Sequence, residues 1–160
     1  MRVFRIEREK YLDQVLSGLG AARSLSARWN SLHTRMVYAS GSRALALLEI
    51  AVHLDLSEDL PTDRFFVEIN IPDNLAYAAA LQESLPPDWS ESPPLRETQL
   101  IGDQFVKEAK TAILRVPSSI VPMEYNYLIN PLHANAAQVR VVEKQRLEMD
   151  KRFLGRTQSQ

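Results

Sequence analysis

The chain has 160 residues, 45% of them hydrophobic, a formal net charge of -1 and no cysteine. This length fits one domain with a substantial core. The lack of cysteine excludes disulfides and thiolate zinc sites, and the near-zero charge disfavours broad nucleic-acid binding. No apolar run approaches the roughly 18 residues that span a bilayer, and the N-terminus lacks the apolar core of a signal peptide. We therefore expect a soluble, cytoplasmic protein without direct contact to nucleic acid or membrane.

The charge is spread unevenly along the chain. Residues 1–54 carry eight Lys or Arg against four Asp or Glu, whereas residues 55–97 carry two against ten. The acidic middle would repel phosphates, and the basic N-terminal third would attract an anionic ligand.

In chain order, the first half of the sequence alternates between strand and helix signals. A strand is predicted over 1–6, with Phe4 and Ile6 on one face and Arg5 on the other. Mixed signals and two glycines indicate a loop within 7–22. A short apolar run over 36–40 predicts a strand that leads into a helix over 44–52. After a polar turn over 55–63, residues 65–71 alternate like a half-buried strand.

The second half adds one long helix and several strands. Residues 74–83 are helix-like, and four prolines form a stiff loop around Trp89 that is either a lid or an ordinary connection. A helix is predicted over 98–109, followed by strands over 112–116, 124–130, 139–142 and 146–153. This mixed order indicates an α+β fold with a largely antiparallel sheet and flanking helices. We expect one domain over 1–155 and a frayed tail over 156–160.

Glu49 is the only charge in the apolar helix over 44–52, which follows the potential caps Ser40 and Ser42. At 3.6 residues per turn it lies on a face with Leu45, Leu48 and Val52 that is expected to pack on the sheet. A buried ionised carboxylate requires a cationic partner, protonation or a place on a cleft wall.

Two upstream residues are candidate neighbours of this carboxylate. Arg28 and Tyr38 precede the helix, so the strand and the loop before it can place them around one pocket with Glu49. Two interpretations remain open. Arg28 and Glu49 either form a structural ion pair, or both belong to a functional pocket.

A second candidate is a pair of serines between Pro117 and Pro122. Ser118 or Ser119, at the end of a strand, can contact a ligand or cap a turn. The sequence lacks a glycine-rich phosphate loop, a nucleophile elbow and a pair of histidines at metal spacing, so we predict no metal site.

Six short motifs occur in the order and spacing of the RES domain, which is named for an Arg, a Glu and a Ser. They are Gly18-Leu-Gly-Ala-Ala, Arg28-Trp-Asn, Val37-Tyr-Ala-Ser, Ala44-Leu-Ala-Leu-Leu-Glu, Val116-Pro-Ser and Asn126-Tyr-Leu-Ile-Asn-Pro. The chain resembles this family over essentially its whole length. The resemblance implies the fold of ADP-ribosyltransferase toxins and a toxin held inactive by an Xre-like antitoxin in a hetero-oligomeric complex.

The resemblance also implies an activity on NAD. Most RES proteins degrade NAD by hydrolysis or phosphorolysis, the latter with inorganic phosphate as co-substrate, and no further cofactor is expected. Some members instead transfer ADP-ribose to a protein. A non-catalytic binding module on the same fold is a further alternative.

Carried over by motif, the catalytic residues are Glu49, Arg28 and Ser118, and NAD is bound by Arg5, Arg28 and Tyr38. Ser118 is preferred to Ser119 because the family serine directly follows the proline.

One departure from the family pattern is Ser26-Ala27, which stands where glycines usually precede Arg-Trp-Asn. The glycines are dispensable if the turn needs no positive φ. If they serve a close backbone approach to the ligand, activity is altered.

Overall fold

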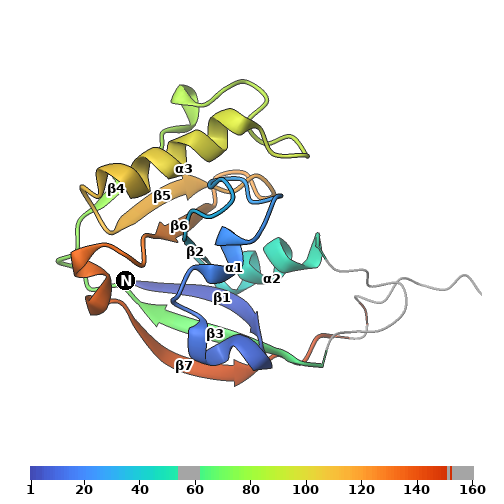
Figure 1. The fold of residues 1–160 in the computed structure, drawn as a ribbon. Coiled ribbons are helices and arrows are strands. Elements are labelled where there is room, and N and C mark those ends of the chain that lie inside the picture. The colour runs from blue at the N-terminus through green and yellow to red at the C-terminus, as the bar shows by residue number, and fades with distance from the viewer. Residues whose placement is uncertain (54–61, 151, 153–160) are drawn as a thin grey trace, which may run out of the picture.

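The computed structural model of this protein describes residues 1–53, 62–150 and 152 (Figure 1). Seven strands form one sheet: β1 (Arg2–Arg8), β2 (Val37–Ser40), β3 (Arg64–Asn70), β4 (Tyr77–Ala79), β5 (Ile113–Pro117), β6 (Tyr125–Ile129) and β7 (Arg140–Arg146). The helices are α1 (Leu19–Ala22), α2 (Arg43–Ala51) and α3 (Arg96–Glu108), with 3-10 turns η1 (Glu9–Gln14), η2 (Gln82–Ser84) and η3 (Ala134–Gln138). No helix in these residues is long and apolar enough to cross a membrane.

The sheet has the strand order β4-β5-β6-β2-β1-β3-β7, and every neighbouring pair is antiparallel except β4 with β5. The predicted α+β class with a largely antiparallel sheet is confirmed. The two halves of the sheet meet at a narrow junction, because β1 is paired with β2 at Phe4 and Ser40 while β1 pairs with β3 along its whole length.

Helix α2 begins where the sequence predicts. The Ser42 side chain caps it by accepting a hydrogen bond from Leu45 N at 3.1 Å. Its buried stripe runs through Ala46, which packs with Ile6 of β1. Of the face predicted to pack on the sheet, Leu45 is buried, whereas Leu48 and Val52 are 40% and 59% exposed. The buried stripe passes through Leu45 and Ala46, so it is turned away from Leu48 and Val52 and towards Ala46.

Arg43 ties the first turn of α2 to the far edge of the sheet. Its guanidinium donates to Gln145 at 2.7 Å, and to Glu68 and Glu143 at 3.2 Å each. It also lies 5.6 Å from the centre of the Phe66 ring. The amino end of α2 is therefore held by both β3 and β7.

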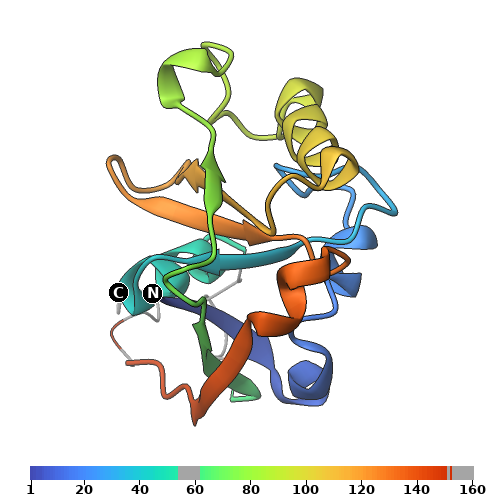
Figure 2. The same cartoon turned by 90° about the vertical axis from the view of Figure 1, so that its left-hand side faces the viewer.

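Helix α3 covers the β5 end of the sheet (Figures 1 and 2). It packs closely on the loop that follows α1, since a Cβ atom on Gly102 would lie 1.6 Å from the carbonyl oxygen of Trp29. The Trp29 ring is buried and lies 5.9 Å from the ring of Trp89. The loop around Trp89 is thus packed into the core and is an ordinary connection.

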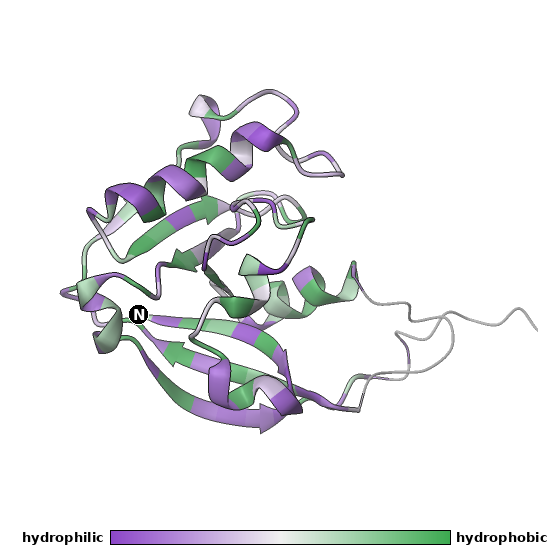
Figure 3. Ribbon diagram, viewed as in Figure 1, coloured by the Kyte–Doolittle hydropathy of each residue, from purple (hydrophilic) through white to green (hydrophobic). Residues whose placement is uncertain are grey.

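Two predicted elements differ from the structure. Residues 74–83 contain the strand β4 and the 3-10 turn η2, where the sequence predicts a helix. The backbone of Ala78 and Ala79 forms strand hydrogen bonds with β5, so these residues cannot form helical hydrogen bonds. The two closing strands are one strand, β7, which ends at Arg146. Figure 3 colours β7 mostly hydrophilic, as suits an edge strand.

Some predicted segments fall on residues that the structure does not describe. Most of the polar turn over 55–63 and the tail over 156–160 lie outside the described residues. Residues 151 and 153, at the end of the predicted last strand, lie outside them as well. The single domain over 1–155 stays a prediction.

Gly102→Ala is expected to destabilise the protein by about 1–3 kcal/mol, because its Cβ overlaps the Trp29 backbone. The higher helix propensity of alanine, about 1 kcal/mol, does not offset such an overlap. Urea denaturation measures the change. Gly20→Ala in α1 is the matched control, since its Cβ meets nothing within 4 Å, and it should leave stability unchanged or raised. Equal stability of Gly102→Ala and wild type would contradict the close packing of α3.

Candidate active site

The Glu49 carboxylate projects from α2 towards the ends of two strands. It is half-buried, and its Oε1 accepts hydrogen bonds from Ser118 Oγ at 3.0 Å and from Asn126 Nδ2 at 2.5 Å. Ser118 directly follows β5 and Asn126 lies on β6. Residues from three elements, distant in sequence, therefore meet at one carboxylate oxygen.

Ser118 combines the two roles that the sequence left open. Its hydroxyl oxygen accepts hydrogen bonds from Ile120 N and Val121 N, both at 3.1 Å, and so caps the turn after β5. Its one hydroxyl hydrogen points to Glu49. With 6% exposure and its proton engaged by a carboxylate, Ser118 is suited to holding Glu49 in place.

Asn126 is a site residue that the sequence reasoning did not select. Its Oδ1 accepts a hydrogen bond from Ser40 Oγ at 2.7 Å, across the paired positions of β2 and β6. Both its ends are thus engaged by polar side chains. The sequence does carry an indication of Asn126: it shares a strand face with the apolar Leu128, and a polar side chain on such a face needs a hydrogen-bond partner.

Arg28 lies in the loop between α1 and β2 and is half-buried. Its Nη1 donates to the backbone oxygens of Trp89 at 2.5 Å and Glu91 at 3.0 Å. Burial lowers the pKa of the Arg28 guanidinium, and the negative charge of Glu49 is the largest effect that opposes this lowering. No ion pair joins Arg28 to Glu49 in the part of the chain that the structure describes, so the structural ion pair considered from sequence does not form.

The Tyr38 side chain fixes the loop that carries Arg28 through two hydrogen bonds. Its hydroxyl donates to Asn30 Oδ1 at 2.6 Å and accepts from Trp29 N at 3.0 Å. Burial raises the pKa of the Tyr38 hydroxyl well above its ordinary value, so the group stays protonated and able to donate. The side chain shares a sheet face with Ser40, two residues along β2, and so lies on the side of the sheet that carries Glu49's partners.

The structure does not bring Arg5 to Glu49, and its predicted part in binding NAD stays a prediction. Strand alternation directs Phe4 towards α2, and therefore directs Arg5 to the opposite face. There its Nη2 donates to Glu7 Oε2 at 2.6 Å, and its Nη1 lies 3.4 Å from the Tyr38 backbone oxygen.

The turn before Arg28 needs no glycine. The non-glycine residues with positive φ are His33, Ala109 and Met123 among those described, so Ser26 and Ala27 both have ordinary backbone angles. The Ala27 oxygen accepts a hydrogen bond from Gln99 of α3 at 2.9 Å, which fixes this turn against the helix.

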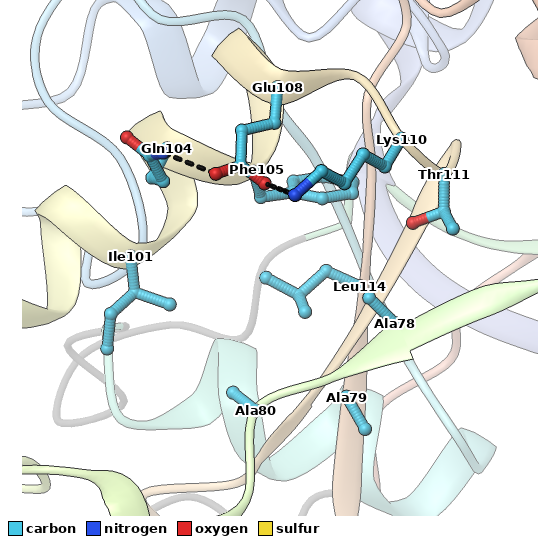
Figure 4. Close-up of a pocket in the computed structure, with 10 residues that line it drawn as sticks. All are labelled: Ala78, Ala79, Ala80, Ile101, Gln104, Phe105, Glu108, Lys110, Thr111 and Leu114. Carbon is cyan, nitrogen blue, oxygen red and sulfur yellow. Dashed lines mark hydrogen bonds and ion pairs between the residues drawn. The ribbon is translucent and has the colours of Figure 1, made fainter.

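The cavity drawn in Figure 4 lies away from these residues, between α3 and β4. It measures about 220 Å³, and its floor is apolar, with Phe105 and Leu114. Its polar rim is a chain in which Glu108 accepts from Gln104 and pairs with Lys110. Within the described residues no group of three or more His, Cys, Asp or Glu side chains can hold a metal ion.

Comparison with known proteins assigns the family. The family model of the RES domain matches residues 2–150. This chain belongs to the RES domain family. It is 41% identical over 141 residues to the Prs ADP-ribosylating toxin of Sphingobium sp. (strain YBL2), covering 87% of this chain and 86% of that protein. It is 38% identical over 127 residues to the Toxin Res of Pseudomonas putida, covering 79% and 84%.

A solved structure supports the same fold at low sequence identity. The crystal structure of the M. tuberculosis MbcT–MbcA toxin–antitoxin complex contains a chain that matches this RES protein with a TM-score of 0.71. The match covers 91% of this chain and 83% of that one at 14% identity. The resemblance to the RES family, drawn from six motifs, is confirmed. The roles of individual site residues stay predictions.

Tyr38→Phe is expected to lower the free energy of unfolding by about 1–3 kcal/mol, because the buried Trp29 N–H and the side-chain Oδ1 of Asn30 each lose a hydrogen-bond partner. The raised pKa of Tyr38 means that its stabilising contribution is complete below the ordinary tyrosine pKa of about 10 and declines as pH rises above it. Denaturation at pH 7 and pH 11 measures both effects. The difference between wild type and Tyr38→Phe should shrink at the higher pH. The exposed Tyr11→Phe serves as control and should show neither change.

Proposed function

We propose that this RES-family protein is the toxin of a toxin–antitoxin pair, and that it degrades NAD by cleaving the nicotinamide–ribose bond. The observation that carries the proposal is the separation of charges at the site. Glu49 is held by two neutral donors, and Arg28 is held by two backbone carbonyls. The two side chains do not form an ion pair with each other, so the carboxylate and the guanidinium can both interact with a ligand.

The chemistry of the bond suits a fixed carboxylate. As the C–N bond breaks, its electron pair leaves with nicotinamide and positive charge develops on the ribose ring, so a nearby negative charge stabilises the transition state. In hydrolysis the new C–O bond forms to water, which loses a proton. In phosphorolysis it forms to an oxygen of inorganic phosphate. Glu49 supplies the charge and can orient the attacking oxygen.

The other residues divide the remaining tasks. Arg28 binds the pyrophosphate, since a guanidinium presents paired donors to paired oxygens. Tyr38 packs on the nicotinamide or ribose while its hydroxyl holds the Arg28 loop. Ser118 keeps Glu49 oriented near the reacting carbon. No cofactor beyond NAD is required by this scheme.

We further propose that an antitoxin protein of the Xre-like type binds this toxin in a hetero-oligomeric, inhibited complex. The support is indirect. Relatives with 33–41% identity are named toxins, and the structural neighbour comes from a toxin–antitoxin complex.

A second candidate function is transfer of ADP-ribose to a protein. The name of the Sphingobium relative, an ADP-ribosylating toxin 41% identical to this chain, favours it. The bond that breaks is the same, and the site needs only a different acceptor.

Glu49→Gln is expected to reduce nicotinamide release from NAD by about 100-fold or more, because the neutral amide cannot stabilise the developing positive charge. The assay uses purified, antitoxin-free protein and follows nicotinamide by chromatography. The matched control is Glu83→Gln, an exposed residue of η2, which should keep wild-type activity. Normal activity in a folded Glu49→Gln protein would disprove the proposal.

The acceptor is identified by following NAD labelled in its ADP-ribose part, with and without phosphate and with and without cell lysate. Degradation predicts free ADP-ribose, or its phosphorylated form when phosphate is present. Label that appears on a protein, and nicotinamide release that depends on lysate, would instead establish ADP-ribose transfer. A protein that releases no nicotinamide under any of these conditions would establish a binding module.

A further inference from the structure

We infer that Asn126 is a positioning residue: its side-chain amide, oriented by Ser40, holds Glu49 so that the second carboxylate oxygen faces the substrate. The chain of contacts runs from the Ser40 hydroxyl to Asn126 Oδ1 at 2.7 Å, and from Asn126 Nδ2 to Glu49 Oε1 at 2.5 Å. The inference deepens the proposed function, because its kinetic test uses NAD cleavage.

The two contacts fix the amide in one orientation. An ionised carboxylate only accepts hydrogen bonds, so the atom of Asn126 that faces Glu49 must be the NH₂ group. The amide oxygen then faces Ser40, whose hydroxyl hydrogen it accepts. Ser40 is 5% exposed and sits opposite Asn126 in the β2–β6 ladder, so its own position is set by the sheet.

The carboxylate is engaged from one side. Ser118 and Asn126 both donate to Oε1, whereas no group in the described part of the chain donates to Oε2. Two donors on one oxygen restrict rotation of the carboxylate. Oε2 is therefore left to accept from a ribose hydroxyl or to face the developing positive charge.

The location of Asn126 is also unusual for a structural polar group. Along β6 its inward neighbour is Leu128, which is fully buried in an apolar cluster. A polar amide in this row is explained by its contact with Glu49. The charged group coupled to Glu49 is Arg28 in the loop before β2, since the negative charge of Glu49 raises the pKa of the Arg28 guanidinium against the lowering by burial.

Asn126→Asp tests the donor role with almost no change in shape. An aspartate can donate to Glu49 only while the two carboxyl groups share a proton, and this proton is lost as pH rises. The ratio of variant to wild-type kcat should therefore be near one at acidic pH and fall about 10- to 100-fold by pH 8–9. KM should change little, because Arg28 still binds the pyrophosphate. Ser40→Ala should lower kcat a few-fold at all pH values.

The control is Asn135→Asp, which adds the same charge at an exposed position of η3 and should match wild type throughout. A kcat ratio for Asn126→Asp that does not depend on pH, or that stays near one at pH 8–9 while Glu49→Gln is inactive, would overturn the inference and leave the proposed function standing.

A second measurement does not depend on activity. In the side-chain amide region of a ¹H–¹⁵N NMR spectrum, one Asn126 proton should be shifted downfield by its hydrogen bond to the carboxylate, and Glu49→Ala should remove that shift. If wild type consumes no NAD, the proposed function fails, and this spectrum still tests whether Asn126 donates to Glu49. An unshifted Asn126 proton in wild type would overturn the inference.

Discussion

A carboxylate in the middle of an apolar helix is the constraint that organises this protein. Where the half-buried Glu49 faces the sheet it requires hydrogen-bond donors, because a carboxylate that loses water without gaining partners destabilises the fold. The sheet supplies these donors from the end of β5 and from β6. The order of strands in the sheet, β5-β6-β2, is what brings both donors to the same helix.

The cationic side of the site depends on different forces. Arg28 sits in a loop without regular structure, and three separate contacts fix that loop. Gly102 of α3 allows the helix to touch the Trp29 backbone, the Tyr38 hydroxyl bridges Trp29 and Asn30, and the carbonyls of the proline-rich loop hold the guanidinium. The carboxylate is thus positioned by the sheet and the arginine by packing, which lets the two charges approach without neutralising each other.

Sequence reasoning reached the elements whose signals are local. The helix carrying Glu49 and the strand carrying Tyr38 follow from periodicity and caps within a few residues. The strand end before the two serines is local as well, but the choice of Ser118 over Ser119 came from the resemblance to the RES family. Sequence reasoning failed where the answer depends on distant partners. The alanine-rich segment over 74–83 reads as helix by propensity, yet its pairing with β5 makes part of it a strand.

The site itself shows the same division. Arg5 carries the residue type expected of a pyrophosphate ligand, but the alternation of β1 directs it to the other face, where it pairs with Glu7. Asn126 was visible only as part of a motif, since its role appears when β2 and β6 are paired. The anchoring of α2 has one more consequence. Arg43 joins the helix to β7, and Glu49 lies six residues further on, about 9 Å along the axis. The outermost strand is therefore joined through one side chain to the helix that carries the carboxylate, although none of its own residues lies at the site.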